Sequence, residues 1–396
     1  MPGPLDGVRV IDLTSVVLGP YATMLMGDMG ADVVKVEAPD GDTTRTTGPG
    51  RNDGMACTFL TSNRNKRSVV LDLKQEPARE ALRRLVDGAD VFVHSIRPQA
   101  VARLGFSPDE VLKRNPRIVY AAIHGFGEAG PYAGRPAYDD IIQSVCGIAG
   151  LMEKRFGEPL FMPMVAADKT CGLTTLYSIL AALFNRERTG NGQFVEIPML
   201  EVMTQFTLME NLYGHTFDPP DGPIGYPRVL AEWRRPCRTK DGWITVLAYT
   251  DRQWARFVTE AGRPDLATDP RYRTLADRTR HIDDTYTLVA EMLRQRTTAD
   301  WLGVLDRLEI PCAPVNRLEE LERDPHLSAI GFFRKVDHPT EGPLTMTAPP
   351  VNFADTPAEI RRMAPTLGQH SAEVLKEIGF SEAEIAAMTE TGATAA

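Results

Sequence analysis

An acidic residue, Asp168, stands directly before a long apolar run in the middle of the chain. Apolar residues recur there at spacings of three, four and seven, which indicates a buried helix. The run consists of Leu173, Leu176, Ile179, Leu180, Leu183 and Phe184. Gly190 and Gly192 end it, after Arg186 and Arg188 in the expected last turn, where cations suit the helix dipole. We therefore expect Asp168 at or next to the N-cap of this helix.

Two interpretations of Asp168 follow from this position. Aspartate is a favoured N-cap residue, so capping alone would explain it. The backbone N–H groups and positive end of a helix also favour an ionised carboxylate, which is the form that a nucleophile needs. The small residues Ala166, Ala167 and Gly172 leave room for a substrate to approach. Cys171 is a second candidate nucleophile, but its place within the helical pattern favours a packed thiol.

The elements that must position Asp168 predict an α/β fold with a parallel sheet. Residues 8–13 and 33–37 are predicted as strands, with a helix over 21–29 that Pro20 helps to start. The unit lacks G-x-G-x-x-G, which argues against an NAD-dependent oxidoreductase even though Glu37 ends the second strand. Further strands are predicted at 68–73, 91–93, 117–124 and 194–197, and a further helix at 76–86.

The composition describes a globular protein with more than one core. The chain has 396 residues, of which 43% are hydrophobic and 24% charged. Its net charge of -9 argues against a nucleic-acid partner bound through phosphates. Five cysteines without clustered spacing fit a reduced, cytoplasmic protein, and seven scattered histidines predict no metal site. We expect neither a signal peptide nor a membrane span, because no stretch approaches ~20 apolar residues.

The segment AADKTCGLTTLYSILAALFNRERTGNGQFVEIPML resembles the signature of the class III CoA-transferase family. That family includes formyl-CoA transferases, carnitine CoA-transferases and alpha-methylacyl-CoA racemases. The N-terminal PLDGVRVIDLTSVVLGPYATMLMGDMGADVVKVEAPDGDTTR and later segments resemble it as well, so nearly the whole chain is covered. The resemblance implies a Rossmann-like large domain, a smaller α/β domain, and two chains interlocked as a homodimer. It makes Asp168 the catalytic nucleophile and coenzyme A a substrate, with no tightly bound cofactor.

The resemblance also implies a set of coenzyme A contacts. They lie after the first strand, in the segment LDLK, in and after HSIRP, and in the loop GFGEAGPYAGRPAYDD. Arg97 and Arg103 are the phosphate candidates, because a guanidinium suits phosphate and the first follows a strand of a parallel sheet. Residues 63–67 form a basic stretch that we predict as a further anion contact. The full set is Ser15, Val16, Val17, Leu71, Lys74, Ser95, Ile96, Arg97, Arg103, Gly125 and Tyr138.

Several activities of this family remain open from the sequence. A racemase needs two acid–base groups, and its family members have a histidine where this chain has Tyr138, a phenol that is a poor base at neutral pH. His124 replaces a usual serine and is more simply explained as a partly buried structural histidine. We favour a CoA-transferase, with a racemase or a non-catalytic acyl-CoA-binding protein as alternatives. Arg45, Arg51 and Arg64 favour a dicarboxylyl-CoA donor such as succinyl-CoA.

The expected transferase chemistry runs through Asp168. Its carboxylate would attack an acyl-CoA to form an aspartyl anhydride and then an aspartyl-CoA thioester. Backbone N–H groups of the glycine-rich loop 125–134 are predicted oxyanion donors. The best-known transferases of the family have a run of glycines over the site, where this chain has only DGPIGYPR, so we assign no lid.

Prolines and glycines between residues 219 and 227 mark a break between domains. We predict a large domain over residues 1–215, a linker over 216–230 and a small α/β domain over 231–315. The family resemblance implies that residues 316–396 return to pack on the large domain. Within the small domain the pattern predicts a strand at 243–249 and helices at 252–260, 285–294 and 299–308, the last capped by Thr297 or Thr298.

Overall fold

The computed structural model describes residues 2–395, which form two compact units. The first unit contains the residues up to Cys146, Phe161–Phe206, and the residues from His326 onward. The second contains Gly147–Leu160 and Thr207–Pro325. The domain boundaries drawn from the sequence stay a prediction, and the sequence pattern did not anticipate that residues 147–160 would join the second unit.

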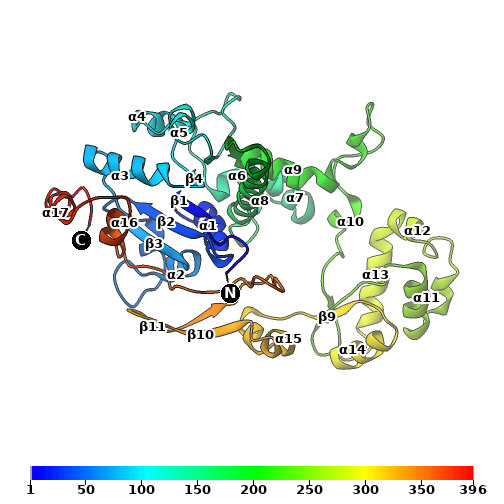
Figure 1. Cartoon of the computed structure of the whole chain (residues 1–396). Coiled ribbons are helices and arrows are strands. Elements are labelled where there is room, and N and C mark those ends of the chain that lie inside the picture. Colours follow the sequence, from blue (N-terminus) through cyan, green and yellow to red (C-terminus); the bar gives the residue numbers. More distant parts are fainter. Residues whose placement is uncertain (1, 396) are drawn as a thin grey trace. The chain divides into compact units, whose positions relative to one another are not determined.

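The first unit is built on a six-stranded parallel sheet with the strand order β3-β2-β1-β4-β5-β6 (Figure 1). Val10 in the middle strand pairs with Val33 on one side and with Val91 on the other. The order reverses between β1 and β4, and ligands of such sheets bind outside the carboxyl ends of the strands at that point. The α/β prediction is confirmed. The strands are β1 (Arg9–Leu13), β2 (Asp32–Glu37), β3 (Lys66–Val70), β4 (Val91–His94), β5 (Val119–His124) and β6 (Gln193–Pro198).

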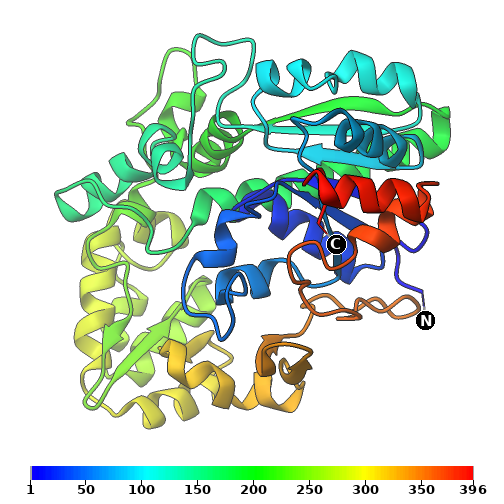
Figure 2. The same cartoon turned by 90° about the vertical axis from the view of Figure 1, so that its left-hand side faces the viewer.

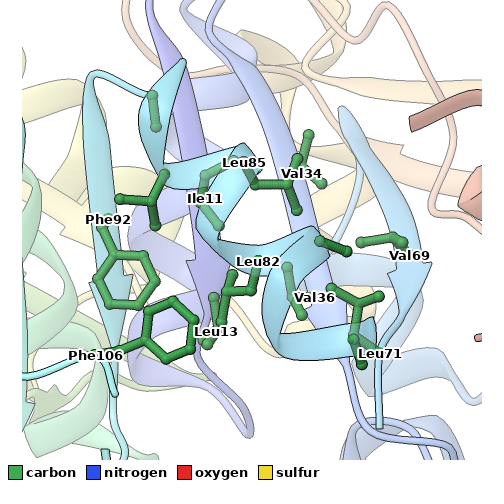
Figure 3. Close-up of a cluster of buried hydrophobic side chains, with 14 of the residues drawn as sticks. Ile11, Leu13, Val34, Val36, Val69, Leu71, Leu82, Leu85, Phe92 and Phe106 are labelled. Carbon is green, nitrogen blue, oxygen red and sulfur yellow. The ribbon is translucent and has the colours of Figure 1, made fainter. Parts of the chain in front are cut away.

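Helices cover both faces of this sheet. On one face α3 (Glu76–Asp87) buries Leu82 and Leu85 against strand side chains that include Ile11, Val34 and Phe92 (Figure 3). The spacing of its apolar residues suits a helix with one buried face, and it matches the predicted 76–86. The other elements of this part of the chain are η1 (Thr43–Thr46), α2 (Cys57–Ser62), α4 (Pro98–Arg103), α5 (Pro108–Arg114), α6 (Asp139–Val145) and α9 (Met199–Asn211).

Two helices, α1 (Leu18–Asp28) and α8 (Ala166–Thr189), pack closely against each other. Glycine permits this approach, because a Cβ on Gly172 of α8 would lie 2.8 Å from the backbone oxygen of Leu18. A Cβ on Gly19 would likewise collide with the side chain of Thr14. The start of α8, which carries Asp168, is thus held next to the β1–α1 turn.

The predicted basic stretch 63–67 is part of the protein interior, so its assignment as an anion contact is wrong. Lys66 begins β3, is fully buried, and donates to Asp12 of β1 at 3.1 Å. Arg64 forms a two-point ion pair with Asp28, with its shorter contact at 2.7 Å. These cations are fixed by carboxylates because a buried unpaired charge is too costly.

The C-terminal part of the chain completes the first unit along β3. The backbone N–H of His370 donates to the oxygen of Ser68 at 2.9 Å, and the hydroxyl of Thr394 donates to the oxygen of Val70 at 2.8 Å. Figure 2 shows the last two helices beside the blue strands that they cover. The elements are α15 (Pro325–Ala329), the antiparallel pair β10 (Phe333–His338) and β11 (Gly342–Thr347), α16 (Ser371–Glu377) and α17 (Glu382–Glu390).

The second unit has its own core around Trp254, Phe257 and Trp301. Thr297 caps α14 through a capping box with Asp300, which confirms the first of its two predicted caps. A three-stranded antiparallel sheet has the order β7-β8-β9. The elements are α7 (Ile148–Phe156), η2 (Tyr213–Thr216), α10 (Pro227–Leu230), β7 (Cys237–Arg238), β8 (Trp243–Val246), α11 (Asp251–Glu260), η3 (Pro264–Ala267), α12 (Leu275–Arg280), α13 (Ile282–Leu293), α14 (Thr298–Arg307), β9 (Cys312–Pro314) and η4 (Leu318–Arg323).

Across residues 2–395, none of the helices combines the length and the apolar character that crossing a bilayer requires.

Candidate active site

A pocket of about 240 Å³ lies at the carboxyl ends of β1, β4 and β5, where the strand order reverses. We call it the Asp168 pocket, because the start of α8 contributes Asp168 to its wall. Seven residues predicted from the sequence line it, namely Ser15, Val16, Ser95, Arg97, Gly125, Tyr138 and Asp168.

A second pocket of about 440 Å³ lies over the ends of β1, β2 and β3. We call it the Lys74 pocket. It is lined by the predicted residues Leu71, Lys74 and Ile96, and also by Ser15. Because Ser15 lines both pockets, they adjoin at the β1–α1 turn. Val17 and Arg103, which were predicted as further contacts, line neither pocket.

The β1–α1 turn between the pockets is held in an unusual backbone conformation. Val16 has a φ of 71°, which is costly for a β-branched residue and persists only when its surroundings fix it. Its N–H donates to Asp42 at 3.2 Å, and the other oxygen of Asp42 accepts from the buried Lys35 at 2.8 Å. Lys35 also donates to the backbone oxygen of Thr14 at 2.9 Å. The turn is therefore anchored to the sheet through a buried ion pair.

Asp168 is the third residue of α8 and is only 8% exposed. The N-cap is Val165, so the interpretation of Asp168 as a cap is wrong. The backbone N–H of Asp168 donates to Asp139 at 2.9 Å, and the other oxygen of Asp139 accepts from the fully buried Gln143 at 2.6 Å. A carboxylate of α6 thus takes up one of the unpaired N–H groups at the start of α8. Asp168 keeps its own side chain for the pocket.

The charge state of Asp168 is set mainly by burial. Burial raises the pKa of Asp168 to about 6, and the carboxylates of Asp139 and Asp140 act in the same direction. The sequence predicted only a favourable helix end, so the size and sign of this shift were not expected. One pH unit above its pKa a carboxyl group is about 90% ionised, so Asp168 remains mostly a carboxylate at pH 7.

Cys171 lies one turn further along α8 and is fully buried. Burial, with the nearby Asp168 as the next cause, raises the pKa of the Cys171 thiol to about 12. Its sulfur contacts the backbone oxygen of Met199 at 3.9 Å. A thiol in this state is not a nucleophile, which agrees with its interpretation as a packed side chain.

The glycine-rich loop after β5 is tied down by carboxylates. The N–H groups of Gly127 and Glu128 donate to Glu201 at 3.0 Å and to Glu196 at 2.8 Å, respectively. The N–H of Gly134 donates to Glu128 at 3.3 Å. These N–H groups are used within the protein, so the prediction that this loop supplies oxyanion donors is wrong for them.

The arginines that favoured a dicarboxylyl-CoA are also occupied. Arg45 forms a two-point ion pair with Glu37, with both contacts at 2.8 Å, and Arg64 pairs with Asp28. Arg51 donates to a backbone oxygen between β10 and β11. None of the three lines the Asp168 pocket. The reason given for a succinyl-CoA donor is therefore wrong.

Three polar residues of the Asp168 pocket were missed as site residues, namely His124, Glu128 and Arg135. Asp139 was also missed, although it directly contacts the backbone of Asp168. Asp139 begins α6, and this helix start could have been used to predict that Asp139 lies near the pocket. Nothing in the sequence, however, predicts that a carboxylate 29 positions earlier pairs with Asp168.

Comparison with known proteins identifies the family. A model of CoA-transferase family III matches residues 5–371. The chain belongs to CoA-transferase family III. The formyl-CoA:oxalate CoA-transferases of Escherichia coli O157:H7 and Shigella dysenteriae serotype 1 are each 32% identical to this transferase over 422 aligned positions. In both cases the alignment covers 99% of this chain and 100% of the relative.

Solved structures agree with this assignment. A CAIB/BAIF family protein from Brucella suis is 31% identical to the transferase with a TM-score of 0.79, and covers 96% of this chain and 100% of its own. The protein Rv3272 from Mycobacterium tuberculosis, in its orthorhombic form, is 30% identical with a TM-score of 0.80, and covers 94% and 99%. Substrates of the family are CoA thioesters. Within residues 2–395, no three His, Cys, Asp or Glu side chains are grouped so as to hold a metal ion.

Proposed function

We propose that this transferase moves CoA from an acyl-CoA to a carboxylic acid through covalent intermediates on Asp168. One observation carries the proposal. A single aspartate, 8% exposed and mostly ionised at neutral pH, lines the pocket at the strand ends where a parallel sheet binds its ligands. A largely buried carboxylate can attack an activated carbonyl, and the reaction would need the bound substrates to keep water from the anhydride that results.

The first half of the reaction uses the donor. An oxygen of Asp168 bonds to the acyl carbon and the carbon–sulfur bond breaks, which gives an aspartyl anhydride and CoA thiolate. The thiolate then attacks the Asp168 carbonyl carbon and displaces the donor acid as its carboxylate, leaving an aspartyl-CoA thioester. Each step takes in one anion and releases one, so no proton transfer is required.

The second half reverses these steps with the acceptor. The acceptor carboxylate attacks the aspartyl-CoA thioester and releases CoA thiolate, which leaves a new anhydride. The thiolate then attacks the acceptor's acyl carbon, forms the new acyl-CoA and returns Asp168 as a carboxylate. Held next to the aspartate, the thiolate can reach an effective molarity on the order of 10⁵ to 10⁸ M.

The two adjoining pockets support an extended coenzyme A. We propose that its thioester lies in the Asp168 pocket and its nucleotide end near the Lys74 pocket, with the chain passing Ser15. Arg97 at the start of α4 and Lys74 are the proposed phosphate contacts. Val17 and Arg103 carry no part of this proposal, because they line neither pocket.

We also propose that the active form is a homodimer. Along α8 the side chains of Leu173, Tyr177 and Phe184 are 48%, 59% and 67% exposed. The sequence predicted Leu173 and Phe184 as members of a buried apolar run, and an exposed apolar stripe of this kind is typical of an interface.

Trapping the intermediate tests the proposal. Formyl-CoA with oxalate is one pair in the panel of donors and acceptors, since the relatives described above are formyl-CoA:oxalate CoA-transferases. The enzyme is incubated with the acyl-CoA and hydroxylamine or borohydride, and the modified residue is mapped by mass spectrometry. We expect modification at Asp168, none in Asp168→Ala, and an unchanged result in Asp53→Asn, which alters an exposed aspartate that lines neither pocket.

Other outcomes identify the alternatives. Coenzyme A binding without exchange or adduct, across a panel of donors and acceptors, would indicate a non-catalytic binding protein. Entry of solvent deuterium at the carbon next to the thioester would indicate a racemase, for which Asp168 and His124 would be the candidate acid–base pair, since both line the pocket.

A further inference from the structure

His124, at the end of β5, is a largely buried member of the Asp168 pocket whose two ring nitrogens make no hydrogen bond within the described residues. Its side chain is 9% exposed, and neither ring nitrogen has a hydrogen-bond partner anywhere in residues 2–395. Buried polar atoms are nearly always paired, and leaving one unpaired costs about 1–3 kcal/mol. An unpaired imidazole in the wall of a substrate pocket therefore suggests that a substrate group supplies the partner.

The neighbouring His94 on β4 shows what a structural histidine looks like in this sheet. Its Nε2 contacts the hydroxyl of Tyr120 at 2.8 Å, and its Nδ1 accepts from the N–H of Ile96 at 3.1 Å. The Tyr120 hydroxyl donates onward to a backbone oxygen, so the His94 ring carries its proton on Nε2. Burial lowers the pKa of His94 to about 3, which keeps this ring neutral. The rings of His94 and His124 are 6.3 Å apart, yet only His124 lacks partners.

Two carboxylates stand on one side of the His124 ring. Its Nδ1 lies 3.6 Å from an oxygen of Glu196 on β6 and 3.9 Å from an oxygen of Glu128 in the following loop. Both glutamates are held in place, because Glu196 accepts from the N–H of Glu128 and Glu128 accepts from the N–H of Gly134. The carboxylates favour the proton on Nδ1, which leaves Nε2 as a hydrogen-bond acceptor.

The charge of this cluster restricts what can bind beside it. One imidazole and two carboxylates carry a net negative charge whether the ring is neutral or protonated. A second carboxylate on the substrate would be repelled there, whereas a hydroxyl group would not. A hydroxyl group can also donate a hydrogen bond. When the His124 proton is on Nδ1, Nε2 is an acceptor and needs such a donor.

We infer that His124 is a specificity-determining residue that accepts a hydrogen bond from a hydroxyl group of the acyl chain bound beside Asp168. The substrate class is then a hydroxy acid and its CoA thioester, rather than a dicarboxylic acid. The inference rests on the proposed function, since it assumes that the acyl group lies in the Asp168 pocket. A site built to bind a hydroxyl discriminates strongly against the analogue without it, because its own polar group is then left unpaired.

Four donors that differ at one group test this inference on the full-length enzyme. Lactoyl-CoA carries a hydroxyl on carbon 2 of the acyl chain, and 3-hydroxypropionyl-CoA carries it on carbon 3. Propionyl-CoA has no hydroxyl, and malonyl-CoA has a second carboxylate in place of the methyl group. With acetate as the common acceptor, we expect kcat/KM for the better hydroxylated donor to exceed that for propionyl-CoA and for malonyl-CoA by about tenfold or more.

Two variants of His124 test whether this residue causes the preference for hydroxylated donors. In His124→Leu, which keeps the volume and removes the hydrogen bond, kcat/KM for the hydroxylated donor should fall by about ten- to a hundredfold, while propionyl-CoA changes by less than about threefold. His124→Gln, which keeps a side-chain acceptor, should restore part of the preference.

Clear results would overturn the inference. One is a wild-type enzyme that uses propionyl-CoA or malonyl-CoA as well as both hydroxylated donors, which decides the matter even if a variant fails to fold. Another is a preference that survives unchanged in His124→Leu. In both cases an adduct on Asp168 would leave the proposed function intact. If no donor gives an Asp168 adduct or exchange, the proposed function itself fails, and the inference fails with it.

Discussion

Replacing Asp168 by its neutral isostere, Asp168→Asn, should stabilise the transferase while it abolishes exchange. In the folded protein the pKa of this carboxyl is about 6, against 3.8 for an unperturbed aspartate. Holding the ionised form in the folded state therefore costs about 3 kcal/mol at pH 7, at ~1.4 kcal/mol per pKa unit. The folded-state pKa already contains the favourable effect of the first turn of α8, so the expected gain in the free energy of unfolding is about 2–3 kcal/mol.

The sign of the pH dependence makes the prediction specific. A raised carboxyl pKa means that the folded state binds the proton more tightly, so the wild type loses stability as pH rises from about 4 to about 6. The variant has no such loss. The gain from Asp168→Asn should thus be greatest at pH 7, about half as large at pH 5, and absent near pH 3.5.

The two compact units allow an internal control in one urea experiment. Circular dichroism follows both units, whereas tryptophan fluorescence follows only the second, since all four tryptophans lie there. We expect Asp168→Asn to shift the dichroism transition of the first unit and to leave the fluorescence transition in place. Asp53→Asn, which alters an exposed carboxylate of the first unit that does not act on Asp168, should shift neither by more than about 0.5 kcal/mol. An Asp168→Asn protein no more stable than wild type at pH 7 would refute our account of this carboxyl. The tryptophans are Trp233, Trp243, Trp254 and Trp301.

Three further predictions concern the surroundings of the site. The rate of adduct formation, measured by stopped flow, should fall as pH drops through about 6, because Asp168 becomes protonated. In Asp139→Asn the midpoint of this pH profile should move to a lower pH, because the variant removes a like charge but keeps an acceptor for the Asp168 N–H. Gly172→Ala should destabilise the first unit by about 1–3 kcal/mol in urea, whereas Gly88→Ala in the same unit, with open space around it, should not. Tyr177→Glu should convert a dimer to monomers in sedimentation equilibrium, and a wild type that sediments as a monomer would contradict the proposed homodimer.

The sequence correctly predicted those strands and helices whose apolar residues follow one regular spacing and whose ends are marked by turn residues. The predicted 91–93 and 117–124 correspond to β4 and β5, and the predicted 252–260 corresponds to α11. In these elements the spacing of the apolar residues matches the positions that are buried, so the local sequence is enough to predict them. The family resemblance, and not the spacing, pointed to Asp168 and its neighbours as one site.

Features that depend on distant partners could not be predicted. Lys66 looks like part of a solvated loop until β1 brings Asp12 within 3.1 Å of it. The raised pKa of Asp168 depends on burial and on α6, which the helix pattern around Asp168 does not contain. The exposed side of α8 was missed for a similar reason, because an apolar stripe has the same spacing whether it meets its own core or another chain.

The C-terminal segment that covers the edge strand β3 has a consequence for folding during translation. Hydrogen bonds such as that from Gly368 to Ser68 join residues 300 positions apart. At about 5–20 residues per second, a ribosome needs about 15 to 60 seconds to reach the segment that seals this edge. During that interval the nascent chain carries an open strand, which is a template for pairing with other chains. Newly made protein should therefore depend on chaperones until translation ends, and truncation of the last 30 residues should yield aggregates.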